Sequence, residues 1–459
     1  MTALDTSFES GASDAQAAPR FMATVSRLAA MSWPIMLGAA VMALLHTGQA
    51  GLLGNIEDRQ PLYLLSMLQP WYLLFFAFLE ALAITGQVFS AKSKSLWPRG
   101  GLKVSVPVLS VLALAVLAAL LGLVELGQGL LVSRFALLDE AAFAVLPQYL
   151  LSLAPFLLFE ILNGSLRGQG RTLPGFAVLA AAVVINLATA WYLLNEQGLG
   201  IEALFAANLV SGAVAAVLIA GVFLLQMRGA GPAPLVPSVI RTATLLAVVG
   251  APVFFSMIVS FFSSAVLFDR MAEFGQEQAA GFLLSVRFRF FLLIPATALA
   301  TALAVMVNQA ETESPARRSL LLSQGCMAVL AIYGALVAGL YAAYPPLVAL
   351  MAEAPEIRQA ANGMLRLLLP TYLLVAFVVF AHVILENLGR GPRVLAWSLL
   401  LETATVYALW TYGTDIAAAL HILIASAVVY GTVFALEFAL LVRVQARTPA
   451  HDGAGAAQA

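Results

Sequence analysis

The sequence predicts an all-α polytopic membrane protein with twelve transmembrane helices in two six-helix bundles. Its composition, its long apolar segments and a Gly- and Pro-rich break near its middle predict this fold. The chain has 459 residues, of which 62% are hydrophobic and 10% are charged, and its mean hydropathy is +0.94. Soluble domains carry roughly 25% charged residues. A soluble core cannot bury this much apolar surface, so most of the chain must face lipid.

Twelve segments are long and apolar enough to cross a bilayer, which requires about 20 mostly apolar residues. Backbone polar groups in lipid have to be paired within their own segment, so these segments are predicted to be helices and not strands. They cover 27–53, 62–90, 104–126, 141–163, 173–194, 201–227, 242–268, 278–306, 320–344, 365–388, 394–413 and 416–442.

Lys and Arg are unevenly distributed among the loops. With the N-terminus in the cytoplasm, sixteen of the 23 lie on the cytoplasmic side and five on the outer side. Cytoplasmic loops are enriched in these residues, so we expect a multi-pass plasma (inner) membrane protein with both termini in the cytoplasm. The net charge of −1 gives no indication of nucleic-acid binding. The single cysteine, Cys326, excludes an intramolecular disulfide and a cysteine-cluster metal site.

The segment GAGPAPLVPS between spans six and seven is typical of a linker. Short matches at offsets of 218 to 223 residues, such as Arg167-Gly168 with Arg390-Gly391, indicate a duplication. Two six-helix repeats have the same topology, so their pseudo-two-fold axis should run along the membrane normal. The expected regions are a disordered cytoplasmic tail (1–26), an N-terminal bundle (27–228), a cytoplasmic linker (229–241), a C-terminal bundle (242–445) and a disordered tail (446–459).

Two stretches carry a recognisable motif. The first, LRGQGRTLPGFAVLAAAVVINLATAWYLL (166–194), contains an RG-x-G-x-T-x-P turn followed by an Asn, and the second is HTGQAGLLG (46–54). Together they resemble the signature of the MATE (multidrug and toxic compound extrusion) family. The matching residues are Thr47, Gly51, Gly54, Arg167, Gly168, Gly170, Thr172, Pro174 and Asn186. In a later G-x-x-G element Gly200 matches, whereas Ala203 replaces the second Gly.

The resemblance implies a secondary antiporter for multidrug or xenobiotic efflux. Such a protein exports a small, often cationic organic compound by alternating access, driven by inward flow of protons or sodium ions. We accordingly expect a monomeric transporter, not an enzyme, with no cofactor, no metal and no nucleic-acid partner.

This chain departs from the family at its acidic positions. His46 replaces the acid of the first span, and Ser260, Ala190 and Val379 stand at the other acidic positions. Sodium prefers anionic or carbonyl oxygens, whereas imidazole titrates near neutral pH. The departures therefore favour proton coupling, and they weaken the expectation of a cationic substrate.

Ionisable residues inside a membrane are costly and are candidates for function. His46 either replaces the carboxylate in proton coupling or is a neutral, hydrogen-bonded histidine. Glu402, near mid-membrane in span eleven, either binds proton or substrate or pairs with an arginine of span eight. Arg287 and Arg289 lie about 15 Å deep in that span. They are about 200° apart around the helix, so both cannot face one cavity. If one of these arginines faces the cavity without an acidic partner, an anionic or zwitterionic substrate is favoured.

Further polar residues lie nearer the cytoplasmic side or at mid-span. Glu80 either lines the cavity or pairs with a lysine of the inner leaflet, and Asn186 is predicted to form an interhelical hydrogen bond. Two sets of residues are predicted to form salt bridges at cytoplasmic helix ends. These are Glu160 with Arg167 and Glu386 with Arg390. His382 and Glu386, four residues apart, form at most a weak metal motif.

Two other functions compete with antiport. A lipid-linked precursor flippase of the same superfamily would use Arg287 and Arg289 to bind a phosphate, but the RGQGRT turn and the twelve spans favour an antiporter. A membrane-embedded enzyme lacks support because the sequence contains no H-E-x-x-H, no G-x-S-x-G and no acidic metal-binding cluster.

Overall fold

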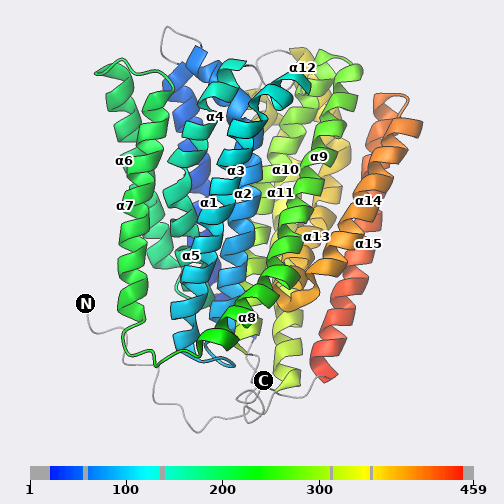
Figure 1. Ribbon diagram of the computed structural model, residues 1–459. Coiled ribbons are helices and arrows are strands. Elements are labelled where there is room, and N and C mark those ends of the chain that lie inside the picture. Colours follow the sequence, from blue (N-terminus) through cyan, green and yellow to red (C-terminus); the bar gives the residue numbers. More distant parts are fainter. Residues whose placement is uncertain (1–20, 55–59, 135–139, 311–313, 352–354, 448–459) are drawn as a thin grey trace.

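The structure, a computed structural model, describes residues 21–54, 60–134, 140–310, 314–351 and 355–447. The described residues are almost entirely helical and contain no strand (Figure 1). In the first half the helices are α1 (Phe21–Gly54), α2 (Gln60–Lys92), η1 (Arg99–Gly101), α3 (Leu102–Arg134), α4 (Glu140–Ser152), α5 (Ala154–Gly168), α6 (Leu173–Asn195) and α7 (Glu202–Gln226). In the second half they are α8 (Leu235–Leu245), η2 (Leu246–Gly250), α9 (Ala251–Glu273), α10 (Gln276–Gln309), α11 (Pro315–Met351), α12 (Pro355–Leu368), η3 (Leu369–Thr371), α13 (Tyr372–Leu385), η4 (Glu386–Arg390), α14 (Gly391–Tyr412) and α15 (Ile416–Arg447).

The number of membrane crossings follows from the length of these segments. Eleven segments of the described chain are long and apolar enough to cross a membrane, and one of them, Pro355–Tyr412, has 58 residues. A continuous helix of that length would extend about 87 Å, nearly three times the thickness of a bilayer core. This segment is broken at Leu388 and Gly389, whose backbone is non-helical, and the chain reverses direction between α13 and α14 (Figure 1). It therefore crosses twice, in agreement with the twelve predicted spans.

The helices pack as two bundles, which we call the N-bundle (α1–α7) and the C-bundle (α8–α15). In the N-bundle α2 packs on α5 and α6 packs on α7, whereas in the C-bundle α9 packs on α14 and α13 packs on α10 and α15. The bundles meet where α1 and α2 contact α9 and α10. Two clusters of buried apolar side chains fill the two bundles.

Several helix ends differ from the expected boundaries because proline and glycine interrupt the spans. The fourth predicted span consists of α4 and α5, which are separated at Leu153 with Pro155 in the first turn of α5. In the seventh span the π-helical η2 precedes Pro252, whose ring removes a helical hydrogen bond. The helix α1 begins at Phe21, inside the predicted tail, and α8 begins at Leu235, inside the predicted linker. The rest of both predicted tails lies outside the described residues.

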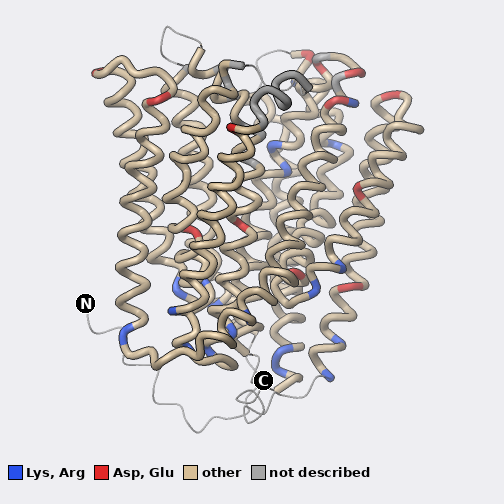
Figure 2. The backbone as a smooth tube through the Cα atoms, viewed as in Figure 1, with Lys and Arg blue, Asp and Glu red and all other residues tan. Residues whose placement is uncertain are grey.

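Lys and Arg gather at one end of the molecule, which is the lower end in Figure 2 and which we call the basic end. The helices α2, α5, α7 and α10 finish there, and α3, α6 and α11 begin there (Figure 1). Lys94 lies at this end. Desolvation and the positive charges of Arg27, Arg171 and Arg99 lower the pKa of its ammonium group from the ordinary value of 10.5.

At the basic end, side-chain hydrogen bonds join the two bundles. Between described residues, all the side-chain hydrogen bonds that connect α1–α7 with α10–α14 lie there. They are Thr24 to Gln324 at 2.6 Å, Arg27 to Gln309 at 3.1 Å, Gln87 to Asn387 at 3.1 Å, Ser95 to the Asn308 carbonyl at 3.5 Å, and Gln309 to the Gly168 carbonyl at 2.8 Å. Among the described residues, side-chain hydrogen bonds therefore join the bundles at one end of the membrane only.

Candidate functional site

The N-bundle encloses a cavity of about 70 Å³ between α1, α2, α4, α5, α6 and α7. Its walls are mainly Leu and Phe, and a few polar side chains point into it. The polar lining residues are His46, Gln49, Tyr72, Tyr149, Glu160 and Asn208. The cavity therefore combines an imidazole and a carboxylate, the two groups suited to carrying a proton at physiological pH.

His46 lies on the part of α1 nearer the opposite end of the molecule. Its Nε2 atom is 2.9 Å from the hydroxyl of Tyr72, and the two rings pack edge to face with centroids 4.7 Å apart. The phenol hydroxyl can donate to the imidazole or accept from it, depending on the tautomer. His46 is therefore hydrogen-bonded, as one of its two predicted roles requires. It also lines a cavity, as a group that exchanges protons would have to.

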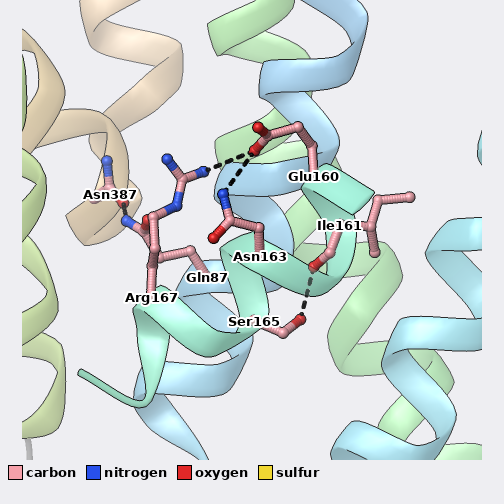
Figure 3. A network of polar contacts seen from close by, with 7 residues as sticks. All are labelled: Gln87, Glu160, Ile161, Asn163, Ser165, Arg167 and Asn387. Atoms are coloured by element: carbon pink, nitrogen blue, oxygen red, sulfur yellow. Dashed lines mark hydrogen bonds and ion pairs between the residues drawn. The ribbon is translucent and has the colours of Figure 1, made fainter. Parts of the chain in front are cut away.

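Glu160 lies on α5, at the edge of the cavity toward the basic end. Its Oε2 atom accepts a hydrogen bond of 3.3 Å from the Asn163 amide and is 3.7 Å from Nη2 of Arg167 (Figure 3). The predicted Glu160–Arg167 ion pair is thus confirmed, but it is longer than a hydrogen bond, and the buried Nε and Nη2 of Arg167 have no hydrogen-bond partner. Glu80 of α2 is partly buried and interacts electrostatically with Glu160.

Four buried side chains form a hydrogen-bonded network behind the cavity. The Asn186 amide donates to Asn208 and to Ser211, and Gln49 donates to both Asn186 and Asn208, each at 2.9 Å. This confirms the predicted interhelical hydrogen bonding of Asn186. The network ties α1, α6 and α7 together and fixes one wall of the cavity.

The signature turn brings the cavity close to the interface between the bundles. A Cβ atom on Gly168 would lie 2.2 Å from the Gln87 carbonyl, so only glycine lets α5 approach α2 this closely. Gln87 in turn donates to Asn387 of the C-bundle (Figure 3). Gly170 has a φ of +79°, which favours glycine, and Pro174 occupies the first turn of α6. The motif therefore positions Arg167 between Glu160 and the interface.

The other signature residues have simpler surroundings. Thr172 is buried at the start of α6, and Thr47 donates to the Ala43 carbonyl at 2.9 Å. A Cβ atom on Gly51 would meet nothing within 4 Å. Gly54 ends α1. None of the described contacts of Thr47, Gly51 or Gly54 reaches the cavity.

A second polar cluster lies in the C-bundle, and we call it the C-cluster. The Ser263 hydroxyl of α9 donates a short hydrogen bond to Glu402 of α14. Tyr430 of α15 interacts electrostatically with both Glu402 and Arg289, and Arg289 also interacts with Tyr372. Arg287 shares none of these interactions. Arg289, but not Arg287, therefore interacts with the same tyrosine as Glu402.

The expected ion pair between Glu402 and an arginine of span eight is not formed. Within the described ranges, neither Arg287 nor Arg289 has a carboxylate within ion-pair distance, and both side chains are exposed. A charged guanidinium at this depth is too costly to face lipid alone. We therefore read the surroundings of Arg289 as a water-accessible part of the C-bundle.

The predicted Glu386–Arg390 salt bridge is wrong. Glu386 is 3.0 Å from Nε2 of His382, and Arg390 is 3.8 Å from Glu437. The non-helical backbone within η4, with Gly389 at a φ of +80°, rotates Arg390 away from the face on which a regular helix would place it. Among the described residues, no three His, Cys, Asp or Glu side chains are grouped to hold a metal ion.

Several residues at these sites were missed from the sequence. Tyr72, Tyr149, Ser263 and Tyr430 lie in apolar segments where an aromatic or hydroxyl residue is unremarkable. A usable signal existed for Gln49 because it follows His46 by three residues and so shares its helix face. Glu160 was interpreted only as a helix-end ion pair, although Pro155 just after Leu153 is a usable signal of the break that places α5 against the cavity.

Comparisons with known proteins agree with this architecture. Residues 252–401 match the family model described as MatE. No curated protein sequence matches the chain.

Solved structures match over nearly the whole length. The Vibrio cholerae MATE transporter VcmN in its bent form is 18% identical with a TM-score of 0.79, and the match covers 93% of this chain and 98% of that chain. A MOP superfamily transporter of Pyrococcus furiosus, described as having a binding pocket of reverse polarity, is 16% identical with a TM-score of 0.78 and coverage of 93% and 97%. An outward-facing MATE family multidrug resistance transporter gives the same identity, score and coverage.

At these identities the structural matches establish the fold, and the family model adds a sequence match in the second half. The chain has the fold of MATE transporters, and its residues 252–401 carry the MatE family pattern.

Proposed function

We propose that the protein is a proton-coupled secondary antiporter that exports a small organic compound from the cytoplasm. It would lie in the plasma (inner) membrane with both termini and the basic end in the cytoplasm, as the distribution of Lys and Arg favours (Figure 2). The observation that carries the proposal is the cavity shared by His46 and Glu160.

The hydrogen bonds at the basic end support an outward-open state. They close the cytoplasmic side, and none of the described interbundle side-chain hydrogen bonds closes the other side. His46 lies about 12 Å from the outer end of α1, at eight residues before Gly54. An external proton would therefore meet His46 and Tyr72 first and Glu160 last.

Protonation of Glu160 provides a route from the cavity to the cytoplasmic closure. A neutral carboxyl no longer attracts the Arg167 guanidinium, which is 3.7 Å away and already short of hydrogen bonds. Arg167 precedes Gly168, which packs on Gln87 and whose carbonyl accepts from Gln309 of the C-bundle. Release of Arg167 would thus loosen two interbundle contacts. A proton can drive this change only if the two states bind it with different affinity.

The experiment uses proteoliposomes that contain the purified protein. Uptake of a panel of fluorescent organic ions into, or their release from, the vesicles is measured under an imposed pH gradient and again after the gradient is collapsed with an ionophore. We expect transport to follow the gradient. Transport that persists unchanged without the gradient, or that follows a sodium gradient instead, would contradict proton coupling.

Glu160→Gln and His46→Asn separate the roles of the two groups. Glu160→Gln should abolish gradient-driven transport, whereas His46→Asn should slow it and leave its direction unchanged. Thr47→Ser is the matched control, because Thr47 lies beside His46 on α1 and donates only to the Ala43 carbonyl.

A further inference from the structure

The C-cluster contains two opposite charges that do not neutralise each other. Arg289 and Glu402 both interact electrostatically with Tyr430, yet they form no ion pair. The Ser263 hydroxyl donates a hydrogen bond to Glu402, and the Tyr430 hydroxyl lies beside the same carboxylate. Opposite charges at one site in a membrane protein normally pair. A separated pair leaves room for a molecule that carries both charges.

All members of the cluster lie at a similar depth in the membrane. Ser263 is ten residues from the outer end of α9, Glu402 is ten residues from the outer end of α14, and Arg289 is thirteen residues into α10. At 1.5 Å per residue these positions are about 15 to 20 Å from the outer helix ends. Four different helices therefore converge on one level near mid-membrane.

The cluster also offers aromatic and hydroxyl surfaces. Tyr430 stacks with Phe434 at 6.3 Å between ring centroids, and its hydroxyl lies beside Glu402. Tyr372 is held in place by a 2.9 Å hydrogen bond to the Ser285 carbonyl. The half-buried Tyr430 ring offers an aromatic molecule a surface to pack against.

We propose that the C-cluster is the substrate site and that it selects an aromatic zwitterion, with the carboxylate on Arg289 and the cationic group on Glu402. Tyr430 lies beside Glu402. Arg287 takes no part, because it lies about 200° around the helix from Arg289 and shares none of its interactions. The site deepens the proposed function by naming the class of compound exported.

A pair of dyes that differ in a single charge tests the site. Rhodamine B carries a carboxylate and a delocalised cation, and its methyl ester keeps the cation without the carboxylate. Binding of each dye to the purified full chain in lipid nanodiscs is measured by fluorescence anisotropy, with empty nanodiscs as the baseline. We expect the wild type to bind rhodamine B about tenfold or more tightly than the ester, because a hydrogen bond to a charged group is worth at least that factor.

Three variants assign the charges. Arg289→Gln should reduce rhodamine B affinity to that of the ester and leave ester affinity unchanged. Glu402→Gln should weaken both dyes by a similar factor and so keep their ratio. The matched control is Arg287→Gln, a change of the same charge on the same helix, which should alter neither affinity. Size-exclusion profiles identical to that of the wild type verify folding.

Three results would overturn the proposal. One is a wild-type protein without preference for the carboxylate dye. Another is an Arg289→Gln variant that keeps the preference. The third is equally tight binding of fluorescein, which lacks the cation and would indicate a site for anions. Dye binding is measured without any gradient, so it tests the substrate site alone. If transport proved independent of the pH gradient, the proposed proton coupling would be wrong, but the proposed substrate site would not be affected.

Discussion

The two bundles share a fold but place their polar groups differently. In the N-bundle Asn186, Asn208, Gln49 and Ser211 are buried and hydrogen-bonded to one another, and Gln49 and Asn208 line the cavity. In the C-bundle Arg289 is exposed and Glu402 is half-buried, and the two charges remain apart. In the roles proposed above, the N-bundle holds a small mobile charge and the C-bundle leaves charge available to a larger molecule.

This difference has a counterpart at equivalent helix pairs. Asn186 and Ser211 join α6 to α7, and Thr405 and Ser426 join α14 to α15, each pair at 2.9 Å. The first pair belongs to a network of four side chains, whereas the second is a single hydroxyl contact. A duplicated scaffold can therefore keep one interhelical bond in place while the surrounding chemistry diverges.

The largest expected effect concerns Glu160. Glu160→Gln cannot ionise, so gradient-driven transport in proteoliposomes should fall by about a hundredfold or more, which begins at the lower end of the range for loss of a proton-transfer group. Binding of rhodamine B should stay within about twofold of wild type, because the dye site lies in the other bundle. Normal transport by this variant would show that Glu160 does not carry the proton. It would contradict the proposed division, in which the N-bundle binds the proton and the C-bundle binds the substrate.

The next effect concerns the contact between the bundles. Asn387→Ala removes the hydrogen bond from Gln87, whose Oε1 already has no partner. The loss of about 1 to 1.5 kcal/mol should raise the population open at the basic end about fivefold to tenfold. Thiol labelling at Ser95→Cys in a Cys326→Ser background reports this opening.

The control for that experiment is Arg393→Ala. It removes a 4.0 Å contact with Glu437 that lies entirely within the C-bundle. Labelling should not change in this variant. An equal increase in both variants would show general loosening and not release of the interface.

The polar networks should differ in their contribution to stability. Asn186→Ala removes three hydrogen bonds to buried partners and should cost about 1 to 3 kcal/mol. Thr405→Val removes one hydroxyl contact and should cost about 0.6 kcal/mol, the average for hydrogen bonds between membrane helices. Reversible unfolding in mixed micelles measures both. Equal losses would contradict the proposed difference between the bundles.

The smallest effect concerns Lys94 at the basic end. Its pKa is lowered in the folded protein, so the protonated form is disfavoured there and costs stability at neutral pH. Lys94→Gln should raise the melting temperature by about 1 °C or less. The gain should shrink as the pH rises through the lowered pKa toward 10.5. If the gain in melting temperature grew with pH, the pKa of Lys94 would not be lowered in the folded protein.

The fold was largely predictable because its determinants are local. Long apolar runs, the distribution of Lys and Arg and the signature turn predicted twelve spans in two bundles. The positions of the breaks were less predictable, because Pro155 and Gly389 mark them but Pro and Gly are also tolerated inside membrane helices. The wrong Glu386–Arg390 pair has the same cause, since its prediction assumed an unbroken helix.

The candidate sites were predictable only in part. An ionisable residue in an apolar span stands out, which is why His46, Glu402 and Arg289 were selected. Which residues meet depends on packing between helices distant in sequence. Tyr72 reaches His46, and Tyr430 reaches Glu402, through such packing, and neither tyrosine differs in sequence from an ordinary membrane aromatic residue.

The division of roles between the bundles is tested most directly by proton release on dye binding. Rhodamine B is added to the purified protein in weakly buffered nanodiscs, and released protons are followed with a pH indicator. An antiporter that exchanges the two should release protons from the wild type, whereas Glu160→Gln should bind the dye and release none. Full proton release from Glu160→Gln, or its loss in Glu402→Gln at saturating dye, would contradict the assignment of the proton to the N-bundle and the substrate to the C-bundle.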